Sequence, residues 1–205
     1  MAKKPVVYGP SMAAELRQLW TTMEFRDSRK PIAVKQAGAI ARAKDRYRAV
    51  GDPLGIPWVW IGCVHQLEGC LDFTTHLHNG DSLSARTVHV PAGRPTAPPV
   101  NGSLPYSWEE SARDALTLKG LQGFKSSWNV PFMLYQWERF NGFGYRLYHP
   151  ETKSPYVWAG SNHYTKGKYI ADGTWGAEHV SKQIGTAVLL RCLIEAGEWA
   201  VPVSP

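Results

Sequence analysis

One apolar segment, PWVWIGCVHQL at Pro57–Leu67, constrains the fold of this chain more than any other stretch. Its apolar residues recur at Trp58, Ile61 and Val64, a spacing that favours a helix over a strand. A helix of this composition belongs in a protein core, yet an acidic residue, Glu68, follows directly. Glu68 is therefore either the polar end of a buried helix or a carboxylic acid that is partly shielded from water so that it can act in catalysis.

Further helices are predicted before and after this segment, at residues 11–23, 31–50, 108–119, 130–140 and 177–197. Ser11 can cap the first of them, and Pro31 can open the second, which Gly51 to Pro53 should end. Ser107 and Glu110 form a capping box, because their side chains can satisfy each other's backbone N–H groups at the start of a helix.

The residues after Glu68 predict a β-hairpin. The β-prone stretches FTTHLH and ARTVHV flank the dipeptide Asn79-Gly80, a strong signal for a two-residue turn. That turn would pair His78 with Asp81 and place Asp72 opposite Thr87. Asp81 would then lie at the tip, and about 20 Å of strand could separate it from Asp72, at about 3.3 Å per residue.

Two other stretches are predicted to be loops. Residues 91–105, PAGRPTAPPVNGSLP, contain too much proline and glycine for a helix or strand. Residues 145–173 form a second loop region that is rich in aromatic residues. The expected fold class is α+β, mainly α, in a single domain spanning residues 1–205, with the β-hairpin inserted after the third helix.

The composition limits the function classes. Nine tryptophans and nine tyrosines are more than the hydrophobic core of a 205-residue chain needs. Some of these side chains are therefore expected to line a groove that binds sugars or nucleobases. The net charge of +6 favours an anionic partner such as nucleic acid, acidic lipid or cell-wall polymer. Three cysteines argue against a disulfide framework. Neither a signal peptide nor eighteen consecutive apolar residues are found, so synthesis in the cytoplasm without stable membrane insertion is expected.

Glu68 has the setting that glycoside hydrolysis requires. An acid protonates a leaving oxygen at neutral pH only where apolar neighbours disfavour its charged form. An inverting enzyme also needs a carboxylate that holds water on the opposite face of the sugar. Asp81 and Asp72 both lie on or near the hairpin and could supply it, and Thr87 could help to hold the water.

Long blocks of the sequence resemble a known family. The segment HQLEGCLDF is similar to the helix end that carries the catalytic glutamate in lysozymes and lytic transglycosylases. The blocks HLHNGDSLSARTVHVPAGRP, WEESARDALTLKG and YQWERFNGFGYRLYHPETKSPYVWAGSNHYTKGKY resemble phage and prophage endolysins of that superfamily. The resemblance spans Gly55 to the last helix, with Gly69 and Cys70 in place of the usual Ser-Ser.

The resemblance implies a lysozyme-like fold and a muramidase that cuts peptidoglycan glycan strands. In phage-type lysozymes a threonine follows the catalytic aspartate by six positions, as Thr87 follows Asp81. The catalytic residues would be Glu68, Asp81 and Thr87, and the substrate-binding residues His76, Asn141, Tyr145 and Tyr164. No cofactor and no metal are expected. A monomer that does not bind nucleic acid would leave the cytoplasm through a holin and act on the host cell wall.

Several alternatives stay open. Asp72 could replace Asp81 as the second carboxylate, and without either one the sugar's own 6-hydroxyl could attack, as in a lytic transglycosylase. The chain could instead be a non-catalytic module that binds cell wall or chitin, or a basic nucleic-acid surface. His76 and His78 with His89 could hold a metal in a wall peptidase, although the predicted register supplies no obvious third ligand.

Overall fold

The computed structural model describes residues 5–124, 127–171 and 173–201. It is mostly helical, with one small antiparallel sheet, so the predicted α+β, mainly α class is confirmed. The chain divides into two compact units: residues 38–128 form one, and residues 1–37 together with 129–205 form the other. The first boundary falls inside helix α2 (Lys30–Arg42), and the second follows Trp128. Among the described residues, no helix combines the length and the hydropathy that a membrane span requires.

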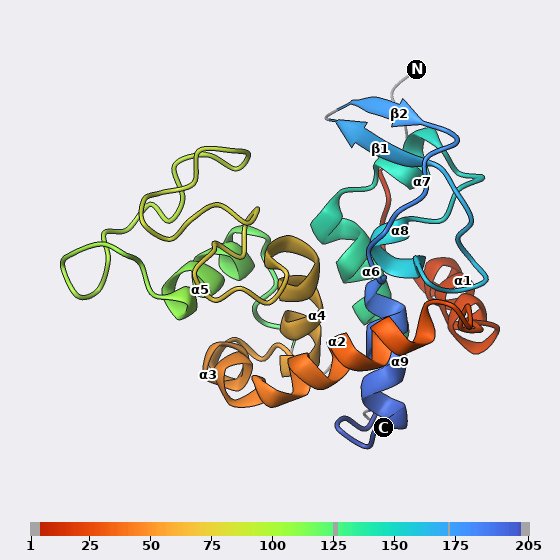
Figure 1. Cartoon of the computed structure of the whole chain (residues 1–205), viewed down its shortest axis with the longest axis horizontal. Coiled ribbons are helices and arrows are strands. Elements are labelled where there is room, and N and C mark those ends of the chain that lie inside the picture. The colour runs from red at the N-terminus through yellow and green to blue at the C-terminus, as the bar shows by residue number, and fades with distance from the viewer. Residues whose placement is uncertain (1–4, 125–126, 172, 202–205) are drawn as a thin grey trace. The chain divides into compact units, whose positions relative to one another are not determined.

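The unit of residues 38–128 is built around helix α4 (Trp58–Gly69), as the apolar segment predicts (Figure 1). Helix α3 (Lys44–Leu54) packs against both α4 and helix α5 (Trp108–Leu118). Trp60, Ile61 and Trp108 are almost completely buried. Since α4 is apolar on nearly every face, neighbours must cover it from several sides, and only its last turn carries a partly exposed acid.

Three sequence predictions about the helices need correction. Gly9, and not Ser11, occupies the N-cap of helix α1 (Pro10–Thr21). The helix predicted for residues 31–50 is two helices, because the chain turns at Ala43 between α2 and α3. Helix α3 then continues through Pro53, which had been expected to end it.

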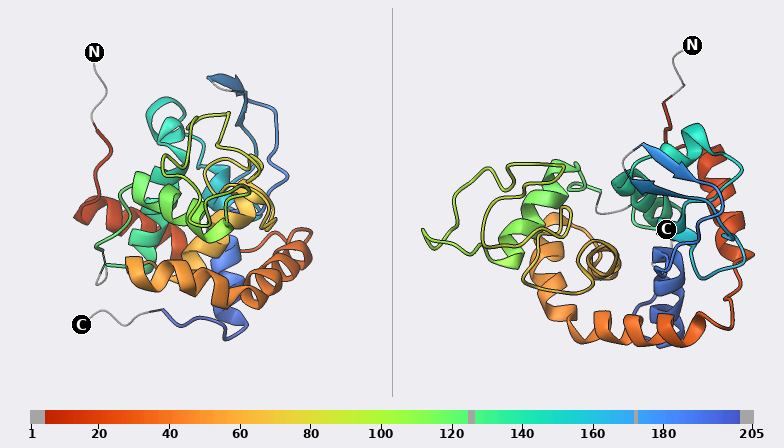
Figure 2. Two further views of the ribbon diagram at one scale, coloured as in Figure 1. Left: turned by 90° about the vertical axis from the view of Figure 1, so that its left-hand side faces the viewer. Right: turned by 45° about the horizontal axis from the view of Figure 1, so that its top comes forward.

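The β-hairpin predicted after α4 does not form. A long irregular loop connects α4 to α5, as the two views in Figure 2 show, and its only regular pairing among the described residues is a single bridge between Thr75 and Ser82. The predicted pairing of His78 with Asp81 is therefore wrong: the N–H of His76 donates to the carbonyl of Asp81 instead. The prediction that residues 91–105 form a loop is confirmed.

The other unit has helix α6 (Val130–Asn141) at its centre, packed against α1, α8 (Pro155–Trp158) and α9 (Thr186–Glu195). The final helix is shorter than the predicted 177–197. The aromatic region 145–173 is also more regular than expected, because it contains most of helix α7 (Gly144–Tyr148), α8 and strand β1 (Lys168–Ala171). Strand β1 pairs antiparallel with β2 (Thr174–Gly176), and Tyr169 lies opposite Trp175.

Packing around α4 yields a stability prediction. A Cβ on Gly62 would collide with the Ile40 side chain and lie 3.1 Å from the Tyr47 ring, whereas a Cβ on Gly38 would meet only the end of the Arg42 side chain at 3.7 Å. We expect Gly62→Ala to lower the free energy of unfolding by about 1–3 kcal/mol through overpacking. Gly38→Ala, in an uncrowded helical position, should raise it by about 0.5–1 kcal/mol. Urea unfolding of both variants tests this, and equal effects would contradict the packing described.

Candidate functional site

Glu68 lies in the last turn of α4 and is partly buried, while most of the helix before it is fully buried. The helix ends because Cys70 adopts the left-handed conformation with φ of 50°, and Leu71 follows with φ of 62°. Two consecutive non-glycine residues at positive φ turn the chain sharply. Glu68 thus lies at the edge of the hydrophobic core, where the chain leaves helix α4.

His65 ties the start of the loop to the core. Its Nε2 lies 3.1 Å from the carbonyl oxygen of Asp72, and its Nδ1 lies 3.0 Å from the hydroxyl of Tyr47. Because a carbonyl can only accept, Nε2 carries the hydrogen and Nδ1 accepts from the tyrosine. The neutral ring is satisfied on both sides, and burial lowers the pKa of His65 to about 4.

Aromatic side chains enclose this histidine. Its ring centroid lies 4.6 Å from that of Phe73 and 4.7 Å from that of Trp108. The guanidinium of Arg46 covers the outer face of Phe73 at 3.8 Å and donates to Glu109 at 2.7 Å. These ring contacts hold Phe73, near the start of the loop, against α4 and α5.

The loop then folds back onto the end of α4. A Cβ on Gly80 would lie only 2.6 Å from the carbonyl oxygen of Glu68, and a Cβ on Gly69 only 2.6 Å from the hydroxyl of Thr75. Gly80 also has φ of +80°, so both its backbone conformation and its close contact require glycine. Asp81, the next residue, is thereby brought to the helix end that carries Glu68.

The carboxylate of Asp81 is occupied by donors from its own loop. One oxygen accepts from the backbone N–H groups of Val88 and His89 at 2.8 and 3.0 Å and from the Asn79 amide at 3.1 Å. The other accepts from the His89 ring at 2.6 Å. Burial alone would raise the pKa of Asp81, but the hydrogen bonds from His89 and Val88 outweigh it and lower the pKa to about 2.

Thr87 and Asp72 hold local structure. The Thr87 hydroxyl donates to the Pro91 carbonyl at 2.5 Å and accepts from the Arg94 N–H at 2.9 Å, which closes the turn between them. The exposed carboxylate of Asp72 accepts from the N–H and hydroxyl of Thr74, and these bonds lower its pKa. The two residues are not opposite each other, because the predicted hairpin is absent.

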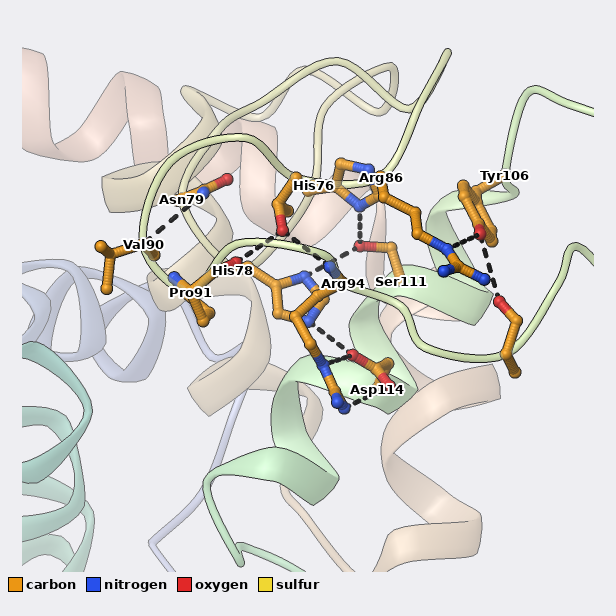
Figure 3. A network of polar contacts seen from close by, with 12 residues as sticks. His76, His78, Asn79, Arg86, Val90, Pro91, Arg94, Tyr106, Ser111 and Asp114 are labelled. Atoms are coloured by element: carbon orange, nitrogen blue, oxygen red, sulfur yellow. Dashed lines mark hydrogen bonds and ion pairs between the residues drawn. The ribbon is translucent and has the colours of Figure 1, made fainter.

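A buried polar network joins the loop to α5 (Figure 3). His76 lies 2.8 Å from the Ser111 hydroxyl, and His78 lies 2.7 Å from the Asp114 carboxylate. Arg94 donates to both oxygens of Asp114, at 2.9 and 2.6 Å. Burial lowers the pKa of His78 although Asp114 opposes this. His76, predicted to bind substrate, is completely buried within the network.

The three histidines considered as metal ligands are engaged by protein groups: His76 by Ser111 and the Ala85 carbonyl, His78 by Asp114 and the same Ser111 hydroxyl, and His89 by Asp81. Within residues 5–124, 127–171 and 173–201, no group of three His, Cys, Asp or Glu side chains could hold a metal ion.

The unit with residues 129–205 contains an aromatic cavity of about 480 Å³. Two residues predicted to bind substrate, Asn141 and Tyr145, contribute to its wall. Tyr164, which was also predicted to bind substrate, is buried outside this wall; its hydroxyl donates to the Gly167 carbonyl at 3.2 Å and accepts from the Ser181 N–H at 3.0 Å. Other wall residues that offer aromatic or polar contacts are Tyr148, Tyr156, Lys168, Tyr169, Ser181 and Gln183.

A second cavity, of about 260 Å³, adjoins the same segment and contains a charged cluster. Arg146 donates to both carboxylate oxygens of the buried Glu138, and to Glu15 at 3.1 Å. Lys153 donates to Glu15 at 3.2 Å. Burial raises the pKa of Glu138, and Arg146 counteracts it. Two acids and two bases balance each other, so the cluster is best explained as structural.

Sequence reasoning singled out neither Glu138 nor Asp114. Glu138 could have been noticed, because it interrupts the apolar run VPFMLYQW as Glu68 interrupts its own. Asp114 gives no such signal, since an acid within an amphipathic helix normally faces solvent. Only the return of Arg94 and His78 to α5 makes it a partner.

Comparison with models of protein families, with curated proteins and with solved structures finds no significant match to this chain.

The lowered pKa of His65 predicts how stability depends on pH. An unfolded histidine binds a proton below about pH 6.5, whereas the folded protein keeps His65 neutral down to about pH 4. This contribution to stability is complete above pH 6.5 and is lost progressively between 6.5 and 4, by about 3 kcal/mol in total. Ring ¹⁵N shifts of His65 should stay constant from pH 7.5 to 5.5, and a midpoint near 6.5 would contradict the buried neutral ring.

The ion pair between Arg94 and Asp114 predicts a measurable coupling. The side chains are 20% and 16% exposed, so solvent screens them only partly. A double-mutant cycle of Arg94→Gln with Asp114→Asn should give a coupling of about 1–2 kcal/mol in the free energy of unfolding. The control pair, Arg48 and Asp52, is 53% and 58% exposed and should give less than about 0.5 kcal/mol. Equal couplings would show that the loop is not held through Asp114.

Proposed function

We propose that this protein is a peptidoglycan-cleaving glycosidase of lysozyme-like fold, in which Glu68 is the general acid. One observation carries the proposal: a partly buried glutamate ends a helix that is otherwise buried, and the following loop folds back onto that same helix end. A carboxylic acid beside a dry core can hold its proton near neutral pH, as a leaving oxygen requires.

In the proposed reaction Glu68 protonates the glycosidic oxygen between N-acetylmuramic acid and N-acetylglucosamine. Water attacks the anomeric carbon from the opposite face, which inverts its configuration. Asp81 is a candidate for the second carboxylate, because the preceding Gly80 lies against the Glu68 backbone, and Asp72 is the alternative. Thr87 contributes by shaping the turn behind it, since its hydroxyl is engaged within the loop. If the 6-hydroxyl of the sugar attacks instead of water, the product is the anhydro sugar of a lytic transglycosylase.

The aromatic cavity supports a carbohydrate substrate. Tyrosine rings provide flat apolar faces, and Asn141, Lys168 and Gln183 add polar groups that can bind hydroxyl and acetamido substituents. The net charge of +6 favours adsorption to an anionic cell wall. A phage or prophage origin, a monomeric state and release through a holin belong to the same proposal and rest on the sequence blocks.

The central test is Glu68→Gln, which keeps the shape of the side chain but removes the transferable proton. We expect glycan cleavage to fall by at least about 100-fold while thermal unfolding and adsorption to cell walls stay unchanged. The control is Glu198→Gln, on an exposed residue outside helix α9, which should retain full activity.

Mass spectrometry of the digested wall separates the competing functions. Reducing-end muropeptides indicate a hydrolase, and anhydro-muropeptides indicate a transglycosylase. Cleaved stem peptides, with activity lost in a chelator, would instead indicate a metal peptidase. If the wild-type protein adsorbs to walls and releases no fragments, the glycosidase proposal is wrong and the chain is a binding module.

A further inference from the structure

An aspartate–histidine pair lies on the loop that folds onto the end of α4. The Nδ1 of His89 is 2.6 Å from an oxygen of Asp81, the residue after Gly80. The Asp81 side chain is 13% exposed, whereas the His89 side chain is 79% exposed. The carboxylate is thus shielded in the loop, while most of the imidazole faces solvent.

The contact fixes where the imidazole carries its hydrogen. An ionised carboxylate only accepts hydrogen bonds, and the lowered pKa of Asp81 keeps it ionised. Nδ1 therefore carries the hydrogen of the neutral ring, and Nε2 keeps its lone pair. A carboxylate that orients an imidazole in this way prepares it to accept a proton.

Asp81 itself is poorly placed to hold a water molecule. One of its oxygens already accepts from three donors, and the other from the His89 ring at short range. A fifth donor would have to compete with these contacts. Asp81 contacts Nδ1 of His89, so it does not occupy Nε2 on the opposite side of the ring.

We propose that His89 is the general base of the reaction and that Asp81 is a positioning residue acting through it. This inference rests on the glycosidase function proposed above. The Nε2 of His89 takes the proton from the attacking water as the oxygen bonds to the anomeric carbon. The glycosidic bond breaks, and its oxygen takes the proton of Glu68. His89 then returns its proton to solvent and Glu68 regains one.

The loop contacts allow the ring to be removed without opening the loop. Backbone N–H groups of residues 88 and 89 and the amide of Asn79 hold Asp81 independently of the imidazole. An alanine at position 89 preserves those bonds, so His89→Ala should keep the fold while losing the base.

The test compares His89→Ala with the wild-type protein on purified peptidoglycan, in the presence and absence of free imidazole. We expect kcat to fall by about 100- to 10,000-fold, with unchanged thermal unfolding and wall adsorption. Imidazole in the buffer should restore part of the activity of the variant and leave the wild type unaffected. The matched control is His179→Ala, which removes an exposed imidazole from the other unit and should neither lose activity nor respond to imidazole.

The outcomes separate this inference from the glycosidase proposal. If His89→Ala cleaves glycan at the wild-type rate while Glu68→Gln is inactive, His89 is not the base and the glycosidase function stands. A loss of activity that imidazole does not restore, accompanied by a lower unfolding temperature, also overturns the inference and assigns His89 to loop structure. If wild-type protein cleaves no glycan, both proposals fail.

Discussion

The neutral, buried imidazole of His65 is the contact on which the arrangement around α4 depends. It joins three parts of the chain at one point: Tyr47 of α3, the α4 backbone that carries it, and the main chain of Asp72, where the loop begins. A buried polar ring is tolerable only when both nitrogens are paired, and here each has one partner of the right kind. Because this point is fixed, the residues that follow can return to the helix end instead of extending away from it.

Two further attachments carry this order along the loop. Gly80 lies against the Glu68 carbonyl, and Arg94 and His78 converge on Asp114 of α5. A loop of this length without strands would ordinarily be mobile. Attachment at its start, at its turn and in its middle gives it a defined path, and this path brings Gly80 against the carbonyl of Glu68. Side-chain hydrogen bonds therefore do the work that a β-sheet ladder was expected to do.

The elements that could be predicted were those whose signals are local. The apolar spacing of α4 and the reciprocal bonds of Ser107 and Glu110 depend on residues at most a few positions apart, and both were predicted correctly. The hairpin failed because Asn79-Gly80 signals a tight turn but not the pairing on either side of it. Thr75 and His76 are engaged instead by the α4 end and by Ser111, contacts that no local pattern contains. Of the candidate site, the position of Glu68 at the end of α4 could be predicted from the sequence, while the pairing of Asp81 with His89 depends on a backbone turn between residues 81 and 89.

The contact of Gly80 with the Glu68 carbonyl has a consequence for how this protein can vary. The separation between the helix end and the Asp81–His89 pair is set by one backbone touching another, with no side chain between them. Outward-facing residues of the loop, such as Ser82 and Ser84, can change in size and charge without altering that separation. Position 80 cannot vary in this way, because a Cβ there would push the Asp81–His89 pair away from the end of α4 that carries Glu68. The exposed residues of the loop can therefore diverge in sequence, while the distance between the end of α4 and the Asp81–His89 pair stays the same.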